Sequence, residues 1–506
     1  MATSFELKQQ ARARLAVEQG TLRKESALPV ALVYPSPYAV AMSSLGYQTI
    51  YREIHAHAGA SAERAFLPDQ PAAYRKSATP LFSYETQRPV SSFPIIAFSL
   101  AYELELSGLI ECLHLAGLPP LAAQRGPHHP LVVIGGPLTF SNPLPAAPFG
   151  DLLVLGEAEE SIHELLAAVR EEPSRERLLA RLAAQSGFFV PAAGRPLGDI
   201  RAADDARLPA YSQILTAETE LSNMFLIEDA RGCSRGCTYC VMGRWSGGMR
   251  VVPPAAVLAR IPAHARRVGL VGAAVSDHPR LCDLVRALVE DGREVSLSSL
   301  RADRLTEELA QLLRRGGARS LTTASDGASE RLRTFVDRKT KEKHLLRAAE
   351  LAAQAGFERL KLYQMVGLPG ETEADIDELA RFSLALAGIA PRLALGIAPF
   401  VAKHRTPLDG APFGPISSIE RKLARLRAAL RGRVEIRPTS ARWAWVEYRL
   451  AQGGPEAGLA ALAAWRAGGS FAAWKRALAE VPVPNVIMPS LERPPRTLRP
   501  LHVMGA

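Results

Sequence analysis

Three of the five cysteines in this chain fall within eight positions. The segment RGCSRGCTYC (231–240) places Cys233, Cys237 and Cys240 at the spacing CxxxCxxC. Thiolates this close in sequence can ligate three corners of an iron–sulfur cube or three positions of a zinc ion. The segment is therefore a candidate metal centre, and the fourth ligand decides which metal it suits.

No obvious fourth protein ligand follows the cysteines. Structural zinc takes a fourth Cys or His, usually from a second paired motif, and the downstream candidates His264, His278 and Cys282 form no such pair. A four-iron four-sulfur cluster held by three cysteines leaves one iron open to a ligand that is not protein. The remaining cysteines, Cys112 and Cys282, lie in apolar helical patterns and are expected to be small core residues.

The cysteine segment directly follows the first of six predicted strands. Short apolar runs separated by helical spacers predict strands over 224–229, 267–275, 294–300, 319–325, 359–367 and 392–401. This pattern favours a partial parallel (β/α)6 barrel, whose working face lies at the carboxyl ends of the strands. We therefore expect the cysteines on that face.

A second set of strands precedes the barrel. Apolar runs over 29–35, 93–100, 130–137 and 151–157, alternating with helical patterns, indicate a doubly wound parallel sheet covered on both faces. Ligands bind such sheets at the carboxyl ends of the strands. The loops expected there are rich in Gly, Pro and Ser.

Four regions follow from these patterns. Residues 1–170 form a Rossmann-like α/β domain, 171–222 a linker, 223–409 the partial barrel, and 410–506 a helical C-terminal region that ends in an extended Pro- and Arg-rich tail.

Composition narrows the class of protein. The 506 residues are 47% hydrophobic and 22% charged, which is ordinary for a globular protein. No run of eighteen apolar residues and no signal-peptide pattern is present, and the odd number of cysteines argues against a disulfide framework, so we expect a cytoplasmic protein without a membrane span. The net charge of +10 is spread over many helical stretches; it could attract RNA, but solvated helix faces are the expected explanation.

The cysteine motif resembles that of the radical S-adenosylmethionine (SAM) superfamily. CxxxCxxC follows the first barrel strand, and the aromatic Tyr239 precedes the last cysteine. The resemblance implies that Cys233, Cys237 and Cys240 bind a 4Fe-4S cluster whose open iron is chelated by SAM. It further implies an electron donor such as flavodoxin or ferredoxin, and a deoxyadenosyl radical that abstracts hydrogen from a small-molecule or peptide substrate.

Three later segments fall where the superfamily contacts SAM. Segment 270–279 takes the place of its Gly-Gly-Glu segment, with Ser276 and Asp277 in place of the acidic residue. Segment 324–342 resembles its ribose and methionine segment, and MVGLPGETEAD (365–375) resembles its Val-Gly-Leu-Pro-Gly-Glu-Thr turn. The SAM contacts implied by these last two segments are Asp326, Ser329, Arg338, Lys339, Gly367 and Gly370.

The segments 32–51, 133–162 and 397–408 resemble the branch with an N-terminal cobalamin-binding domain. The Asp-x-His-x-x-Gly motif that supplies an axial histidine is absent from residues 1–170, but many members of the branch bind cobalamin without it. The corrin contacts implied by the resemblance are Tyr38, Ser43, Ser44, Leu45, Tyr102, Glu103, Gly135, Gly136, Pro137, Thr139, Gly156 and Glu157.

Three functions are compatible with these patterns. The leading hypothesis is a cobalamin-dependent radical SAM methyltransferase that acts on an unactivated carbon. The second is a radical SAM enzyme without cobalamin that performs a rearrangement, cyclisation or sulfur insertion, with the first domain holding substrate or a partner. The third is a non-catalytic iron–sulfur or zinc protein that binds RNA or a partner.

Overall fold

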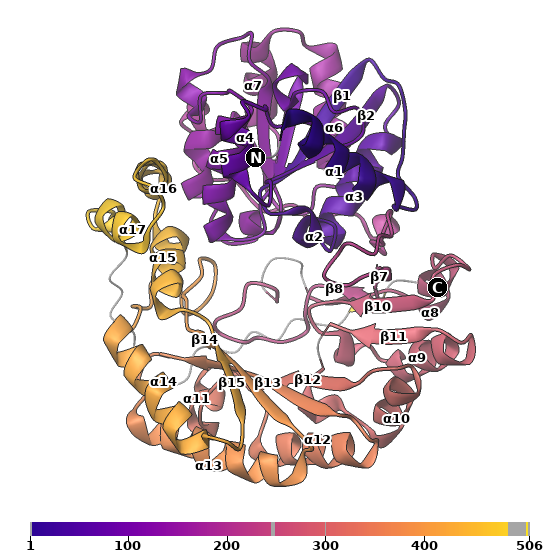
Figure 1. The fold of residues 1–506 in the computed structure, drawn as a ribbon, viewed down its shortest axis with the longest axis vertical. Helices are drawn as coiled ribbons and strands as arrows, with labels where there is room; N and C mark the ends of the chain where they lie inside the picture. Colours follow the sequence, from indigo (N-terminus) through magenta and orange to yellow (C-terminus); the bar gives the residue numbers. More distant parts are fainter. Residues whose placement is uncertain (1–2, 244–247, 299, 484–501, 504–506) are drawn as a thin grey trace. The chain divides into compact units, whose positions relative to one another are not determined.

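The computed structural model describes residues 3–243, 248–298, 300–483 and 502–503 (Figure 1). The chain divides into two units. An N-terminal unit comprises Met1–Met224 and Arg449–Pro482, and a barrel unit comprises Phe225–Tyr448 and Val483–Ala506. Most of the predicted extended tail (484–501 and 504–506) lies outside the described residues.

A six-stranded sheet forms the centre of the N-terminal unit. Its order is β2-β1-β3-β4-β5-β6, in which β1 to β5 run parallel and β6 antiparallel. The bounds are β1 (Leu28–Tyr34), β2 (Ala60–Phe66), β3 (Ile95–Ser99), β4 (Leu131–Gly135), β5 (Leu152–Val154) and β6 (Phe188–Phe189). The four predicted strands are present as β1, β3, β4 and β5, and the doubly wound sheet is confirmed.

Strand β2 was not predicted because its sequence, ASAERAF, is polar. Its Arg64 is nevertheless fully buried, and it forms ion pairs of 2.7 Å with Glu18 and 2.6 Å with Glu85. A buried ion pair of this kind keeps charged residues inside the fold only where both partners are satisfied. The hydrophobic pattern alone therefore cannot reveal this strand.

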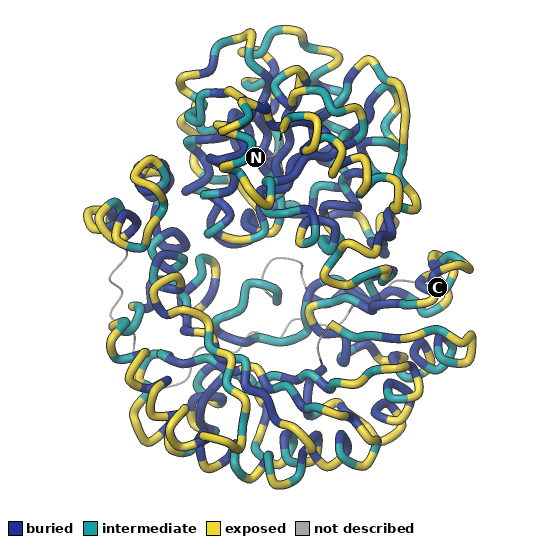
Figure 2. The backbone as a smooth tube through the Cα atoms, viewed as in Figure 1, coloured by how far each residue is buried: buried dark blue, intermediate teal, exposed yellow. Residues whose placement is uncertain are grey.

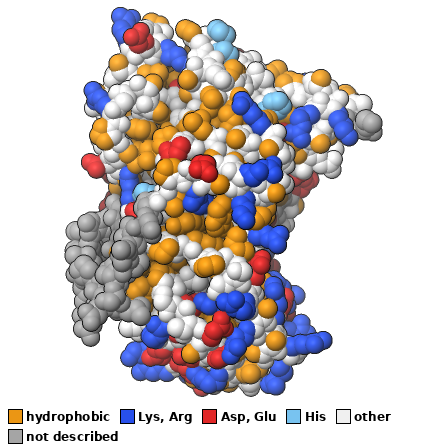
Figure 3. Space-filling model, turned by 90° about the vertical axis from the view of Figure 1, so that its left-hand side faces the viewer, with side chains coloured by type: hydrophobic (Ala, Val, Ile, Leu, Met, Phe, Trp, Pro, Cys, Tyr) orange, Lys and Arg blue, Asp and Glu red, His pale blue; other side chains and the backbone are white. Residues whose placement is uncertain are grey.

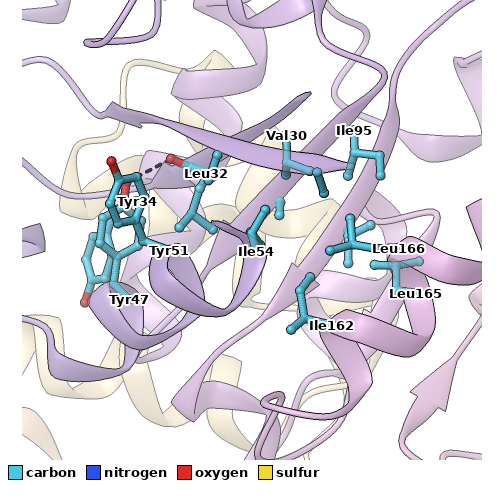
Figure 4. Packing of buried hydrophobic residues seen from close by; sticks show 14 of the residues in the cluster. Val30, Leu32, Tyr34, Tyr47, Tyr51, Ile54, Ile95, Ile162, Leu165 and Leu166 are labelled. Carbon is cyan, nitrogen blue, oxygen red and sulfur yellow. Dashed lines mark hydrogen bonds between the residues drawn. The ribbon is translucent and has the colours of Figure 1, made fainter. Parts of the chain in front are cut away.

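Helices α3 (Leu45–Ala56) and α6 (Ser161–Glu171) pack on one face of this sheet. Their apolar sides meet the side chains of β1 and β3 in a single cluster (Figure 4). The Tyr47 hydroxyl donates a hydrogen bond of 2.8 Å to the Leu32 carbonyl, so the ring packs in the core while its polar end is satisfied. Helix α5 (Leu106–Leu115) carries the fully buried Cys112, as expected.

Residues 171–222, expected to form a linker, contain regular structure. Helix α7 (Arg175–Ala183) and strand β6 lie in this stretch, and Leu178, Leu182 and Phe188 pack into the core of the N-terminal unit.

Helices α16 (Pro455–Arg466) and α17 (Phe471–Leu478) also belong to the N-terminal unit. Helix α15 (Ala441–Gln452) precedes them, and the boundary between the units falls within it, before Arg449. The indole of Trp465 donates a hydrogen bond of 2.9 Å to Glu111 of α5, and a Cβ on Gly458 would lie 2.1 Å from the Pro145 carbonyl oxygen. The C-terminal helices therefore dock tightly on the turn before β5.

All six predicted strands of the barrel unit are present. They are β7 (Met224–Glu228), β10 (Arg267–Val271), β11 (Glu294–Leu297), β12 (Ser320–Ala324), β13 (Arg359–Val366) and β14 (Leu393–Pro399). They form sheets of order β11-β10-β7 and β12-β13-β14-β15, and a parallel bridge between Leu300 and Thr323 links the two. Strand β15 (Glu435–Pro438) lies in the region expected to be helical, and its four residues are too few to give a strand pattern.

Helices cover the outer side of the barrel strands (Figure 1). They are α9 (Leu281–Glu290), α10 (Glu307–Arg315), α11 (Glu330–Phe335), α12 (Glu342–Gln354), α13 (Glu373–Ile389) and α14 (Ile416–Leu430). Burial alternates along β13, where Leu360 and Leu362 are buried and Tyr363 is exposed. In Figure 2 the exposed parts of the barrel unit include the outer turns of the covering helices. Cys282 in α9 is only partly buried, against the expectation of a core residue.

On the face shown in Figure 3, Lys and Arg side chains are interspersed with Asp and Glu. Exposed ion pairs also join neighbouring helices, such as the pair between Arg425 of α14 and Asp377 of α13. Among the residues that the structure describes, no helix is both long enough and apolar enough to cross a membrane.

Candidate active site

The three cysteine side chains line one cavity of about 170 Å³. The loop that carries them follows β7 and the short strand β8 (Ala230–Arg231). Ala273 and Ala274 after β10, Leu300 and Arg301 after β11, and Ala324 at the end of β12 complete much of the lining. The cavity thus lies at the carboxyl ends of the strands, as predicted.

The segment after β10 holds the cysteine loop. Asp277 accepts two hydrogen bonds of 2.8 Å from the Arg235 guanidinium and one of 2.9 Å from the Ser234 hydroxyl. Burial alone would raise the pKa of Asp277, but the Arg235 pair outweighs it and lowers that pKa below its usual range. The neighbouring Ser276 is buried and accepts a hydrogen bond of 3.0 Å from the Arg301 backbone. Both side chains, which were expected to contact SAM, make hydrogen bonds with protein groups instead.

Burial raises the pKa of Cys233 and raises that of Cys240 to about 11, and charge on the neighbouring cysteines adds to both shifts. Without metal, the Cys233 and Cys240 thiols are therefore protonated near neutral pH. Binding of iron has to displace these protons, because the thiolate is the ligand.

A second polar group lies beside the cysteines. Asp326, at a left-handed backbone position just after β12 (φ 59°), forms an ion pair of 2.8 Å with Arg338 and a hydrogen bond with the Tyr239 hydroxyl. Burial and the Asp326 charge raise the pKa of Tyr239, which stays protonated. Tyr239 and Arg338 line the cysteine cavity, whereas Lys339 is exposed and lies 3.8 Å from Asp337.

Three other predicted SAM contacts do not line this cavity. Ser329 is fully buried, caps the start of α11 and donates a hydrogen bond of 2.6 Å to Asp375. The Gly367 backbone donates one of 2.8 Å to Glu371, which also binds Lys422 at 2.8 Å. Gly367 and Gly370 both have left-handed φ angles of 84° and 73°, which favour glycine and explain the turn without a ligand.

Two charged residues near the cysteines were not predicted. Arg301 is 5% exposed, and it donates through Nη2 to Asp303 while its Nε and Nη1 have no hydrogen-bond partner in the part of the chain described. Asp229, at the end of β7, is fully buried, and burial raises its pKa well above the usual range. Because the sequence is rich in arginine, nothing in it distinguishes Arg301 from the other arginines. Asp229 could have been identified from the sequence, because it is an acidic residue between a predicted apolar strand and the cysteine motif.

Several predicted corrin contacts are engaged inside the N-terminal unit. The Tyr38 hydroxyl donates a hydrogen bond of 2.7 Å to Glu18, and Glu157 accepts one of 2.6 Å from the Ala203 backbone. The Thr139 hydroxyl donates to the Gly136 carbonyl and accepts from the backbone of Gly156, which is buried. These groups hold the loops at the strand ends together.

Other predicted corrin contacts are more accessible. Tyr102 is exposed, and Ser43, Ser44 and Leu45, at the start of α3, are half-buried. Gly135 and Gly136 are half-buried and Pro137 is exposed, while Glu103 is buried. A Cβ on Gly136 (φ 101°) would lie 2.6 Å from the Leu100 carbonyl oxygen, so only glycine lets the loops after β3 and β4 approach so closely.

Comparisons with known proteins bear on both units. Residues 227–383 match the family model described as the radical SAM superfamily, and residues 46–191 match the one described as radical SAM proteins, N-terminal. Together the two matches span more than half of the chain. The first match begins within β7 and includes the cysteine loop.

Two curated relatives are similar over much of the chain. The uncharacterized protein MJ0966 of Methanocaldococcus jannaschii is 25% identical over 79% of this chain and 83% of its own. The uncharacterized methyltransferase PH0819 of Pyrococcus horikoshii is 23% identical over 50% of this chain and 58% of its own.

Among solved structures, the cobalamin-dependent SAM radical enzyme OxsB, with aqua-cobalamin and SAM bound, is 14% identical with a TM-score of 0.48. The match covers 71% of this chain and 52% of OxsB, so the chain spans about half the length of that protein. The family matches argue against a non-catalytic zinc or RNA-binding protein. The chain belongs to the radical SAM superfamily, whose members are enzymes that use a 4Fe-4S cluster and SAM.

Proposed function

We propose that this chain is a cobalamin-dependent radical SAM methyltransferase that acts on an unactivated carbon. The observation that carries the proposal is the strand order of the N-terminal unit, in which β2 lies on one side of β1 and β3 on the other. In open sheets of this order, ligands bind at the carboxyl ends of the strands where the winding reverses, between β1 and β3. The half-buried Ser43, Ser44 and Leu45 follow β1, and the exposed Tyr102 follows β3.

The cysteine cavity fits a cluster ligated by three cysteines. No three Cys, His, Asp or Glu side chains among the described residues are grouped so as to hold a single metal ion. A cube binds its cysteines through three different irons, so its ligands line a cavity instead of meeting at one point. Bound together, the cluster and SAM supply a one-electron cleavage that generates a carbon radical.

Within this cavity, Arg301 suits the carboxylate of SAM. Its Nε and Nη1 groups make no hydrogen bond with any described residue although the side chain is buried, and buried donors are costly unless a ligand accepts from them. The guanidinium charge itself lies 3.0 Å from Asp303 and 3.7 Å from Asp277. Arg338 is paired with Asp326 at 2.8 Å. Arg301 would therefore orient SAM, while Arg338, Asp326 and Tyr239 fix the wall beside the cysteines.

Radical SAM enzymes use an electron donor, and for this chain we propose a flavodoxin or ferredoxin. The hypothesis of a radical enzyme without cobalamin is favoured by one observation: Tyr38, Thr139 and Glu157, expected to contact the corrin, make hydrogen bonds inside the N-terminal unit instead.

Metal content after anaerobic reconstitution with iron, sulfide and hydroxocobalamin distinguishes these functions. About four irons and about one cobalt per chain support the methyltransferase. Four irons without cobalt contradict the cobalamin assignment and leave the second candidate. As a control for the cysteine loop, Cys282→Ser, outside the cavity, is expected to retain the iron that Cys233→Ala loses.

A further inference from the structure

The inner face of the barrel unit contains a second cavity, of about 380 Å³. It is lined by residues of β13, β14 and β15, three neighbouring strands in Figure 1, and by residues that follow β12 and β15. Its lining includes Asp326, Lys361, Tyr363, Gly396, Arg437 and Thr439. The volume suits a small molecule or a single side chain of a larger one.

Strand register places these residues in adjoining rows. Tyr363 pairs with Ala324 on one side and Gly396 on the other, and Gly396 pairs with Arg437. Lys361 lies two positions before Tyr363, on the same face of β13. An aromatic ring and two cations therefore share one concave surface.

Because Gly396 has no side chain, the Tyr363 ring can pack directly against its backbone. A Cβ there would lie 2.7 Å from two ring carbons, so the ring lies directly over the backbone of β14. The Tyr363 side chain is nevertheless 54% exposed, which is unusual for a ring that faces the inside of a barrel. This arrangement presents a rigid aromatic surface to the cavity.

Positive charge exceeds negative charge beside this ring. Glu435 accepts a hydrogen bond of 2.6 Å from Arg437 and lies 3.9 Å from Arg359, and the Arg437 hydrogen bond lowers its pKa, so it remains a carboxylate. Lys361 makes no hydrogen bond and no ion pair with any described residue, although its charge acts on Glu435. One carboxylate thus faces three cations.

The cavity adjoins that of the cysteines. Ala324 lines the cysteine cavity and Asp326, two residues later, lines this one; Arg338 of the cysteine cavity is ion-paired with Asp326. A molecule bound over Tyr363 would therefore lie next to the place where the radical is formed. Its charge would be balanced by Lys361, with further hydrogen bonds from Arg437, which is also paired with Glu435; Asp326 is paired with Arg338.

We infer that this second cavity binds the substrate, and that the substrate is a small anion whose carboxylate or phosphate pairs with Lys361 and Arg437 while a planar group stacks on Tyr363. The inference rests on the proposed radical function. Cation–carboxylate and cation–phosphate contacts are the strong hydrogen bonds of such sites, and the ring gives orientation.

The test uses three aromatic probes: benzoate, phenyl phosphate and the uncharged benzamide. Each is titrated into the reconstituted enzyme at low salt, with binding followed by ligand-observed NMR. We expect at least one anion to bind about tenfold more tightly than benzamide. Tighter binding of benzoate identifies a carboxylate substrate, and tighter binding of phenyl phosphate identifies a phosphate. Benzamide binding as tightly as both anions overturns the inference.

Matched variants assign the binding to this cavity. Lys361→Met is expected to weaken the preferred anion about tenfold and leave benzamide unchanged, whereas Lys343→Met, on the exposed side of α12, changes neither. Gly396→Ala displaces the Tyr363 ring and is expected to weaken all three probes. Unchanged anion affinity in Lys361→Met, or an equal loss in Lys343→Met, overturns the inference.

Two further measurements test this inference independently of the proposed function. Displacement of the bound anion by saturating SAM assigns the cavity to SAM and overturns the inference; simultaneous binding supports it. The titration is repeated on the iron-free chain, since probe binding requires neither iron nor an electron donor. A failure of iron reconstitution and a failure of probe binding are therefore observed independently.

Discussion

Arg235, between the first two cysteines of the motif, donates hydrogen bonds of 2.8 Å from its Nε and Nη2 atoms to the two carboxylate oxygens of Asp277. Asp277, expected from the sequence to lie at the SAM site, thus fastens the cysteine loop to the segment after β10. Such paired contacts between a guanidinium and a carboxylate are both strong and directional.

Replacing Asp277 is expected to weaken cluster retention. Asp277→Asn keeps the shape but removes the charge that Arg235 and Ser234 bind, at a cost of about 1.5–3 kcal/mol to the loop. Iron per chain after reconstitution and desalting should fall severalfold below that of the unaltered enzyme. Asp283→Asn, in an exposed pair with Arg280, is the control and should retain iron. Full iron retention in Asp277→Asn would show that the pair does not hold the loop.

Ser329→Ala is expected to affect stability and not SAM binding. The hydroxyl caps α11 and donates to the buried Asp375, so its loss should destabilise the barrel unit by about 1–2 kcal/mol in denaturant unfolding. SAM affinity, measured by equilibrium dialysis on the reconstituted enzyme, should be unchanged. A tenfold loss of SAM affinity with normal stability would instead support the direct contact inferred from the sequence.

Asp375 should make the fold sensitive to acid. Although burial alone would raise its pKa, hydrogen bonds from Ser329, Thr372 and Arg331 lower it to about 2. Because the folded pKa lies below the unfolded value of about 3.9, the stabilisation is complete above pH 4 and is lost as the pH falls toward 2.

The matched variant is Asp375→Asn, which should lose about 2 kcal/mol of unfolding free energy at pH 7. The difference between the two proteins should narrow as the pH falls from 4 toward 2, measured by urea unfolding at each pH. A difference that is constant over this range would contradict the assignment.

Gly458 tests the docking of the C-terminal helices on the N-terminal unit. Gly458→Ala places a Cβ against the Pro145 carbonyl and is expected to destabilise that unit by about 1–3 kcal/mol. Gly388→Ala is the control, because this exposed helical glycine has open space around it and alanine should be neutral or stabilising by up to about 1 kcal/mol. Equal unfolding midpoints for both variants would contradict the docking.

Much of this architecture is predictable from the sequence because parallel strands that are buried on both faces consist of short runs of apolar residues. Strands β1, β3 and β7 are examples. Strand β2 was not predicted because its charged Arg64 is buried. Arg64 is buried through ion pairs with Glu18 and Glu85, which lie in distant segments of the chain. No local pattern reports such a pairing.

In the active site, too, some residues can be identified from the sequence and others cannot. The spacing of the cysteines is local and identifies them, whereas the role of a single polar side chain depends on what folds around it. The sequence predicts SAM contacts for Asp277 and Ser329, whereas in the structure Asp277 binds Arg235 and Ser329 binds Asp375. Arg301 becomes notable only through its burial and through the two donor nitrogens that make no hydrogen bond with any described residue.

Cys233, Cys237 and Cys240 are proposed to hold the cluster that cleaves SAM. This assignment is tested by the 5′-deoxyadenosine formed from SAM by the anaerobically reconstituted, reduced enzyme, with Cys233→Ala and Cys282→Ser in parallel. We expect formation by the unaltered enzyme and by Cys282→Ser, and none by Cys233→Ala. Undiminished formation by Cys233→Ala would contradict it.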